Sequence, residues 1–329
     1  MKSTAQKLIS TGPLLTKDAI SAAYERIRVS VVETPAEEVS DLFPQTRTRA
    51  YFKMENLQDT GSFKLRGATN KILGLSKLQA EAGVIAASNG NHGLGVAEAA
   101  GRAGISAEVF VSTQVSPEKA RRIEHRGASI RRVGTDPLEA ELAARASAAA
   151  SGKVFISPYN DLDVMAGQGT VAVELLQQLG ELDAVFVAVG GGGLIGGIGA
   201  YLKSASPHTE VVGCWPQNSP VLYESIKAGR ILDVPEQPTV SESTAGGLEQ
   251  NSVTLDVCRR VIDHSALVSE DEILAAMQLV RNSRGWLIEG AAGVAVAAFL
   301  KESARYQDKK VAIIICGGNL SEKVRAQIT

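Results

Sequence analysis

AVFVAVGGGGLIGGIGAYL, residues 184–202, is a run of nineteen residues without a charge. Nineteen residues are close to the length that a membrane-spanning helix needs. Seven of them are glycine, however, and four stand together at Gly190–Gly193. Glycine weakens both helices and strands, so the block divides the run. We therefore predict a buried strand, a glycine loop and a helix, and no membrane span.

Strand and helix patterns of this kind alternate along much of the chain. Short apolar segments at 84–87, 107–111, 185–189 and 311–315 predict strands, and the first three are followed by helical patterns. Such alternation predicts parallel sheets with helices on both faces. We expect an α/β fold of two domains, each a mostly parallel twisted sheet flanked by helices. The small domain is placed at 55–153, and the large domain combines 1–54 with 154–329.

Composition narrows the classes of function. The 329 residues include 21% charged residues and carry a net charge of −2, which does not favour nucleic acid or an anionic membrane as partner. The three cysteines, Cys214, Cys258 and Cys316, are widely spaced and indicate neither a disulfide framework nor a zinc site. Residues 1–20 lack the apolar segment of a signal peptide, so we expect a cytoplasmic protein.

The stretch TGSFKLRGA, residues 60–68, contains a candidate reactive lysine. Ser62 is predicted to cap a helix, which places Lys64 in the first turn. The N-terminus of a helix is the positive end of its dipole, so a lysine there loses its proton at a lower cost. The alternative is a solvated lysine on an amphipathic helix.

Ligands of open α/β sheets bind beyond the carboxyl ends of the strands, so three loops that follow predicted strands are of interest. The loop SNGNHG at 88–93 suits a carboxylate or phosphate, although a polar turn has the same composition. Gly190–Gly193 suits a phosphate, and it also fits loosely the glycine pattern of dinucleotide-binding loops. CGGN at 316–319 brings a thiol to the same edge, unless Cys316 is only a buried structural cysteine.

A lysine, a phosphate loop and polar loops at one sheet edge together suggest a phosphorylated aldehyde as cofactor. Lysine forms a Schiff base with pyridoxal phosphate, and the protein then supplies orientation and electrostatic tuning.

Six motifs carry a resemblance to a known family. SFKLRGA at 62–68, SNGNHG at 88–93, the four glycines and CGGN at 316–319 occur in this order, together with AGQGT at 166–170 and EGAAG at 289–293. The chain resembles the threonine/serine dehydratase and serine racemase group of the fold type II (tryptophan-synthase-β-like) pyridoxal phosphate enzymes. The resemblance covers nearly the whole chain.

The resemblance implies a role for each matched position. Lys64 looks like the catalytic lysine that forms the Schiff base with the cofactor. The other implied cofactor-binding residues are Phe63 beside the ring, Asn91 at the ring 3′-oxygen, Gly190, Gly191, Gly192, Gly193 and Leu194 at the phosphate, and Cys316 at the pyridine nitrogen. The implied substrate-binding residues are Ser88, Asn89, Gly90 and His92.

The implied reaction is the dehydration and deamination of a β-hydroxy amino acid such as L-threonine or L-serine to a 2-oxo acid and ammonia. In the resemblance, Lys64 moves the α-proton, and a neutral Cys316 beside the ring nitrogen favours elimination. Racemases of the group have a serine base where this chain has Asn89, so racemisation is disfavoured. The resemblance implies acidic metal ligands at the position of Trp215 and near Val221, and because neither is present we expect no metal. Because the chain ends at Thr329, we expect no regulatory domain and no isoleucine feedback.

Several alternatives stay open at this point. One alternative is that the substrate is another 3-hydroxy amino acid, such as hydroxyaspartate or phenylserine. A second is that the protein is a serine racemase. Two further alternatives belong to other functional classes. One is a dinucleotide-binding oxidoreductase, and the other is a regulatory protein that binds pyridoxal phosphate without turnover. The expected partners are a small-molecule amino acid and further copies of the chain, in a homodimer or homotetramer.

Overall fold

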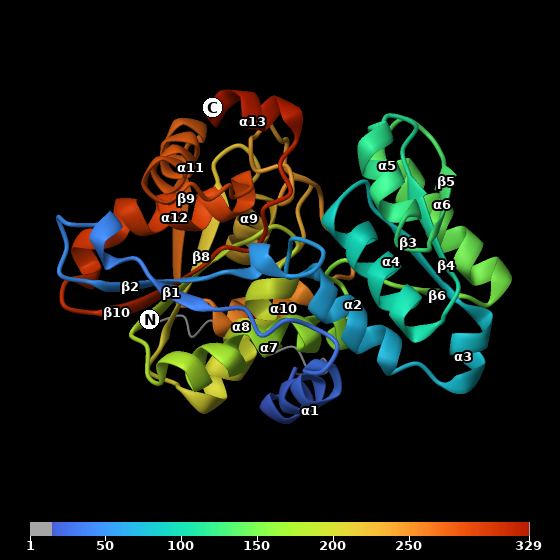
Figure 1. The fold of residues 1–329 in the computed structure, drawn as a ribbon, viewed down its shortest axis with the longest axis horizontal. Helices are drawn as coiled ribbons and strands as arrows, with labels where there is room; N and C mark the ends of the chain where they lie inside the picture. The colour runs from blue at the N-terminus through green and yellow to red at the C-terminus, as the bar shows by residue number, and fades with distance from the viewer. Residues whose placement is uncertain (1–14, 329) are drawn as a thin grey trace, which may run out of the picture.

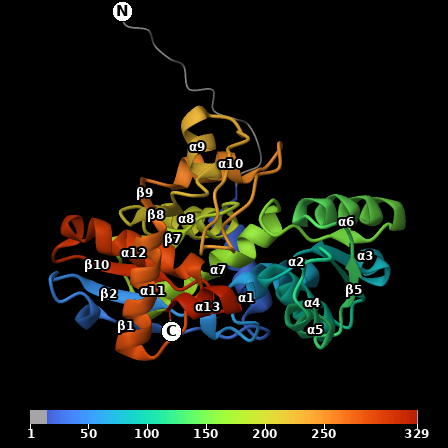
Figure 2. The same ribbon diagram turned by 90° about the horizontal axis from the view of Figure 1, so that it is seen from above.

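The computed structural model describes residues 15–328. Two sheets, each with its own helices, lie side by side, the larger on the left and the smaller on the right in Figure 1. Figure 2 shows the same arrangement from above. Residues 1–14 lie outside the described part, so most of the stretch for which we expect no signal peptide does too.

The larger sheet combines strands from both ends of the chain. Its order is β1-β2-β10-β7-β8-β9, and only the β1–β2 pair is antiparallel among the described strands. The strands span Ala36–Glu38 (β1), Arg49–Lys53 (β2), Lys310–Ile314 (β10), Ala184–Ala188 (β7), Glu210–Pro216 (β8) and His264–Val268 (β9). The expected α/β fold with mostly parallel strands is confirmed.

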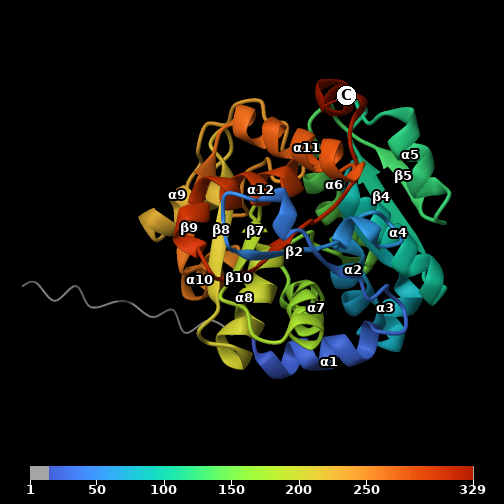
Figure 3. The same ribbon diagram turned by 60° about the vertical axis from the view of Figure 1, so that its left-hand side comes forward.

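Helices cover both faces of the larger sheet (Figure 3). On one side lie α1 (Lys17–Ile27), α7 (Leu162–Leu179), α8 (Gly193–Ala205) and α10 (Thr254–Val261), and on the other α11 (Glu270–Arg284) and α12 (Gly290–Glu302). The remaining elements of this part are α9 (Val221–Ala228), α13 (Glu322–Ile328) and the 3-10 helices η1 (Ser40–Leu42), η2 (Glu55–Leu57) and η3 (Ser303–Tyr306). Ser269 and Glu272 form a capping box at the start of α11.

The smaller sheet is parallel, in the order β5-β4-β3-β6. Its strands span Ser129–Arg132 (β5), Ala107–Val111 (β4), Val84–Ala87 (β3) and Val154–Phe155 (β6). Its helices are α3 (Lys77–Ala82), α4 (Asn91–Ala103), α5 (Pro117–Glu124) and α6 (Pro137–Ser151). The domain division at 55–153 stays a prediction; β6, which begins one residue after it, pairs with β3.

The stretch 184–202 folds as predicted, with β7, a glycine loop and α8. Its apolar side chains are buried in the core of the larger sheet. Within residues 15–328, no helix is long and apolar enough to cross a membrane.

Helix α2 (Lys64–Leu73) packs against both α4 and α7, and so lies between the two sheets. A Cβ on Gly167 of α7 would stand 2.6 Å from the Cα of Gly67, so only glycine lets the two backbones approach this closely. The helix ends at Leu73, and Gly74 is its C-cap residue.

A buried cluster of four charged side chains stabilises the position of α2. Arg66 donates hydrogen bonds to Glu55 of η2 at 2.8 Å and to Glu174 of α7 at 2.6 Å. Lys53 at the end of β2 donates to the same Glu174 at 2.6 Å. All four side chains are buried, and the two cations balance the two carboxylates. A buried charge is stable only when it is paired in this way, so the cluster fixes the start of α2 relative to α7 and β2.

Candidate active site

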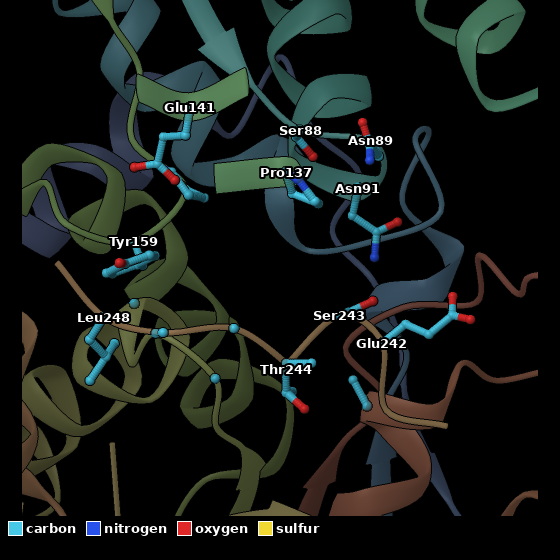
Figure 4. A pocket seen from close by; sticks show the side chains of 18 of the residues that line it. Ser88, Asn89, Asn91, Pro137, Glu141, Tyr159, Glu242, Ser243, Thr244 and Leu248 are labelled. Atoms are coloured by element: carbon cyan, nitrogen blue, oxygen red, sulfur yellow. The ribbon is translucent and has the colours of Figure 1, made fainter. Parts of the chain in front are cut away.

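A cavity of about 960 Å³ opens between the two sheets. Its wall combines the start of α2, the loops after β3 and β7, residues 158–159, the segment 233–249 and residues near Glu289 and Cys316. Figure 4 shows side chains from the loop after β3, from 137–141, from Tyr159 and from 242–248 around the cavity. The strand-end loops singled out from the sequence therefore meet at one place.

Lys64 is the first residue of α2, as predicted, but Ser62 does not cap the helix. Instead Ser62 pairs with Gly317 in an isolated antiparallel bridge, and the Phe63 N–H donates to the Cys316 carbonyl at 3.1 Å. This pairing holds Ser62 in an extended segment, and its buried hydroxyl has no hydrogen-bond partner. The capping prediction is wrong because a long-range strand contact takes the place of the local cap.

The Lys64 ammonium lies in the cavity wall. Its Nζ donates to the Pro158 carbonyl at 2.9 Å and stands 5.1 Å from the centre of the Phe63 ring. Burial lowers the pKa of Lys64 to about 8, against the opposing attraction of Glu289 and Cys316. A lysine with this pKa is partly unprotonated near neutral pH, which a nucleophilic amine requires.

The four-glycine loop has no room for side chains. A Cβ on Gly191 would stand 2.4 Å from the Tyr159 ring, and one on Gly190 would stand 2.8 Å from the Thr244 Cα. Gly192 has a φ of +86°, a conformation that favours glycine. The loop leads into α8, whose thirteen residues and free N–H groups at the start suit an anion. Leu194 also lines the cavity.

The loop after β3 contributes Ser88, Asn89 and Asn91 to the wall. Asn89 donates from Nδ2 to the Ser112 hydroxyl and accepts from the Ser112 N–H, both at 2.9 Å. Its amide is therefore fixed on both sides. Asn91 begins α4, with Gly90 at the cap position.

Gly90 and His92 are not among the residues that line the cavity. The His92 ring is buried, with Nε2 2.8 Å from the Ile156 carbonyl oxygen. Burial, with the nearby Lys64 charge, lowers the pKa of His92 to about 3, so the ring is neutral at physiological pH. The substrate-binding roles expected for these two residues stay predictions.

Cys316 lies in the wall behind Lys64, and its buried thiol is 3.8 Å from Glu289 Oε1. Burial and the neighbouring carboxylate raise the pKa of Cys316, so the thiol is neutral. Burial also raises the pKa of Glu289, although hydrogen bonds from Asn91 and Ser243 favour its charged form.

Sequence reasoning gave no role to Glu289, Tyr159 or the segment 233–249. Glu289 accepts a hydrogen bond from Asn91 Nδ2 at 2.8 Å, so it belongs to the same site. The available signal was its place in the EGAAG motif, directly before a helix of small residues. Tyr159 has no local signal, because only the fold brings its ring against Gly191.

These residues fit pyridoxal phosphate. The amine of Lys64 suits an aldehyde, and the glycine loop at the start of α8 forms a cradle that any Cβ would fill. The Cys316 thiol and the Asn91 amide are polar partners for a ring. In the part of the chain that the structure describes, no three metal-ligating side chains gather as a metal site would need.

The sequence matches a known protein family over most of its length. A family model described as "Pyridoxal-phosphate dependent enzyme" matches residues 27–317. An L-threonine ammonia-lyase of Thermotoga maritima is 37% identical over 93% of this chain and 76% of its own length. A β-hydroxyaspartate dehydratase of Paracoccus denitrificans is 33% identical over 93% of this chain and 96% of its own.

Among solved structures, serine racemase from Dictyostelium discoideum superposes with a TM-score of 0.86. It is 33% identical, and the match covers 93% of this chain and 99% of that one. The similarity thus covers nearly the whole chain.

Proposed function

Because the chain belongs to the pyridoxal-phosphate dependent enzymes, we propose that it dehydrates and deaminates β-hydroxy amino acids such as L-threonine and L-serine. The observation that carries this proposal is that Lys64 and a neutral Cys316 line the same cavity. The ammonia-lyase relatives support the same reaction class.

Pyridoxal phosphate, when bound, withdraws electrons from the α-carbon of an amino acid joined to its carbonyl carbon. Lys64 would hold the cofactor at rest, the N–H groups at the start of α8 would hold its phosphate, and Asn91 and Cys316 would contact its ring. Cys316 is a neutral thiol, so it cannot keep a ring nitrogen protonated as a carboxylate would. A ring partner of this kind would weaken the electron withdrawal and so would favour elimination of the β-hydroxyl.

Lys64 is also the proposed base that takes the α-proton once the substrate has displaced it. Its lowered pKa suits that role, because an amine must be unprotonated to accept a proton. The loop with Ser88 would orient the substrate carboxylate. Loss of water and hydrolysis of the product then convert threonine into 2-oxobutanoate and ammonia.

Racemisation needs a second base on the opposite face of the substrate. Asn89, the residue expected there, is an amide that cannot take up a proton at neutral pH, and Ser112 holds both of its polar atoms. As a serine racemase, the protein would therefore lack the second base. Incubation with L-serine should yield pyruvate and no D-serine.

The decisive experiment is a panel of β-hydroxy amino acids assayed for 2-oxo acid and ammonia, with visible spectra recorded in parallel. Lys64→Ala should abolish both product and the absorbance of lysine-bound cofactor. Lys77→Ala, at an exposed lysine of α3, is the matched control and should behave like the wild type. Retained turnover in Lys64→Ala would contradict the proposal, and a normal spectrum without ammonia from any substrate would favour a regulatory protein.

We further propose that the protein works in the cytoplasm as a homodimer or homotetramer. The three cysteines are buried and unpaired with one another, as in reducing compartments. The oligomeric state rests on the resemblance alone, and sedimentation equilibrium of the purified protein tests it.

A further inference from the structure

The wall of the cavity is strongly acidic. Of the described residues that line it, Lys64 is the only one with a cationic side chain. The acidic lining residues are Asp136, Glu141, Asp233, Glu236, Glu242, Glu249 and Glu289. A second carboxylate on a substrate would therefore enter a region of like charge.

Glu141 is the acidic residue that α6 places on the wall. Figure 4 shows its carboxylate directed into the cavity, on the side of Tyr159 and Leu248. The Glu141 charge reaches the Tyr159 hydroxyl, whose pKa is raised to about 12 by burial and, in smaller part, by Glu249 and Glu141. Glu141 therefore lies close to Tyr159, which lines the same cavity.

Arg145, one turn further along α6, is the nearby cation, but it is already occupied. Its Nε donates to Glu141 Oε1 at 3.0 Å, and its Nη2 forms ion pairs with Glu141 at 2.9 Å and Glu249 at 2.6 Å. Its guanidinium also lies over the Phe155 ring, 4.2 Å from the centroid. Two carboxylates and one guanidinium leave a net charge of −1, so Arg145 is not free to bind a substrate carboxylate.

The proposed function leaves one direction for the substrate side chain. The α-carboxylate is assigned to the loop with Ser88, and the amine must reach the cofactor at Lys64. Other parts of the wall include α6, which contributes Glu141, and the segment 233–249, which contributes Glu242 and Glu249. A side-chain carboxylate would lie among these groups without a cationic partner.

We propose that Glu141, with Glu249, restricts this enzyme to β-hydroxy amino acids with uncharged side chains and excludes 3-hydroxyaspartate. This inference rests on the proposed dehydratase function. It assigns to α6 a specificity role that is separate from cofactor binding.

The test compares L-threonine with L-threo-3-hydroxyaspartate as substrates of the holoenzyme. The wild type should favour threonine in kcat/KM by about a hundredfold or more, since an unpaired buried charge is strongly rejected. Glu141→Gln keeps the size of the side chain and removes its charge. It should raise the hydroxyaspartate-to-threonine ratio by about fivefold or more. Glu249→Gln should change the ratio in the same direction, and it replaces Glu141→Gln if that variant does not fold.

Glu181→Gln, at an exposed glutamate outside the cavity, is the matched control and should leave the ratio unchanged. A wild-type ratio near one would overturn the inference. The inference would also be overturned if neither Glu141→Gln nor Glu249→Gln changed the hydroxyaspartate-to-threonine ratio. It would likewise be overturned if the control Glu181→Gln changed this ratio as much as they do.

A binding measurement separates this inference from the proposed function. L-Aspartate and L-2-aminobutanoate lack the β-hydroxyl, so their binding to the holoenzyme, followed by visible absorbance, needs no turnover. Aspartate should bind about tenfold more weakly or worse, and added salt should narrow the difference. If no β-hydroxy amino acid is turned over but aspartate still binds more weakly, the proposed dehydratase function is wrong and the exclusion of a side-chain carboxylate is supported. Equal affinities for the two amino acids would overturn that exclusion.

Discussion

Asn319 donates a hydrogen bond from Nδ2 to Asn91 Oδ1 at 2.7 Å. Its orientation is determined by its other partners, because Arg122 can only donate to Asn319 Oδ1 and the Thr60 carbonyl can only accept from Nδ2. Asn91 must then present its own Nδ2 to the Glu289 carboxylate, 2.8 Å away. A chain of directional contacts thus leads from the smaller domain to the proposed ring site.

Asn319→Asp should weaken cofactor binding. An aspartate cannot donate to Asn91 or to Thr60, so at least one buried acceptor loses its partner, at a cost of about 1–3 kcal/mol. The dissociation constant of pyridoxal phosphate, measured by titrating the apoprotein, should rise accordingly, with a changed absorbance maximum. Asn282→Asp, at an exposed position of α11, is the control. Equal affinity in the two variants would show that Asn319 does not orient Asn91.

Gly191→Ala should also weaken cofactor binding. The added Cβ would lie 2.4 Å from the Tyr159 ring, and overpacking of this kind costs about 1–3 kcal/mol. In a Tyr159→Leu background the same substitution should cost less, because the opposing ring is gone. Gly74→Ala, where the nearest atom would be 3.3 Å away, is the control. An equal loss of affinity with and without Tyr159 would argue against the steric explanation.

Arg66→Met should strongly destabilise the fold. It leaves the buried Glu55 and Glu174 carboxylates with Lys53 as their remaining cation in the cluster, and breaking a buried ion pair costs about 3–5 kcal/mol. Urea denaturation measures the loss. Arg28→Met removes an exposed ion pair with Glu25 and should change the unfolding free energy by at most about 1 kcal/mol. Similar losses in both variants would refute a special role for the cluster.

His92 should contribute to acid unfolding. Its pKa is depressed in the folded protein to about 3 from the usual 6.5, so the unfolded chain binds the proton first as the pH falls. Its contribution is fully present above about pH 6.5 and is lost between pH 6.5 and 3, by about 1.4 kcal/mol per pH unit. His92→Asn should flatten the dependence of unfolding free energy on pH in this window. His125→Asn, at the exposed end of α5, should leave the slope unchanged; identical slopes for the wild type and His92→Asn would contradict the prediction.

Local sequence patterns were sufficient for the parts of the fold that local physics decides. The glycines of 184–202 divide that run into β7 and α8, and the Ser269–Glu272 box starts α11. The role of Ser62 could not be predicted in this way, because its partner Gly317 is distant in the chain. The same reason explains why Glu289 and Tyr159 received no role: each contacts the proposed site through residues remote in sequence. Lys64, Asn91, the four glycines and Cys316 do line one cavity, while His92 and Gly90 do not line it.

The bridge between Ser62 and Gly317 has a mechanical consequence. Through it, and through the hydrogen bond from the Phe63 N–H to the Cys316 carbonyl, the segment that precedes Lys64 is joined directly to the segment that carries Cys316. Lys64 and Cys316 are therefore kept in register by backbone contacts that lie next to each of them, in addition to the packing of their side chains. The nucleophile and the proposed ring partner are thus coupled in the way that residues of neighbouring strands are, so a substitution that displaces one segment is expected to displace the other.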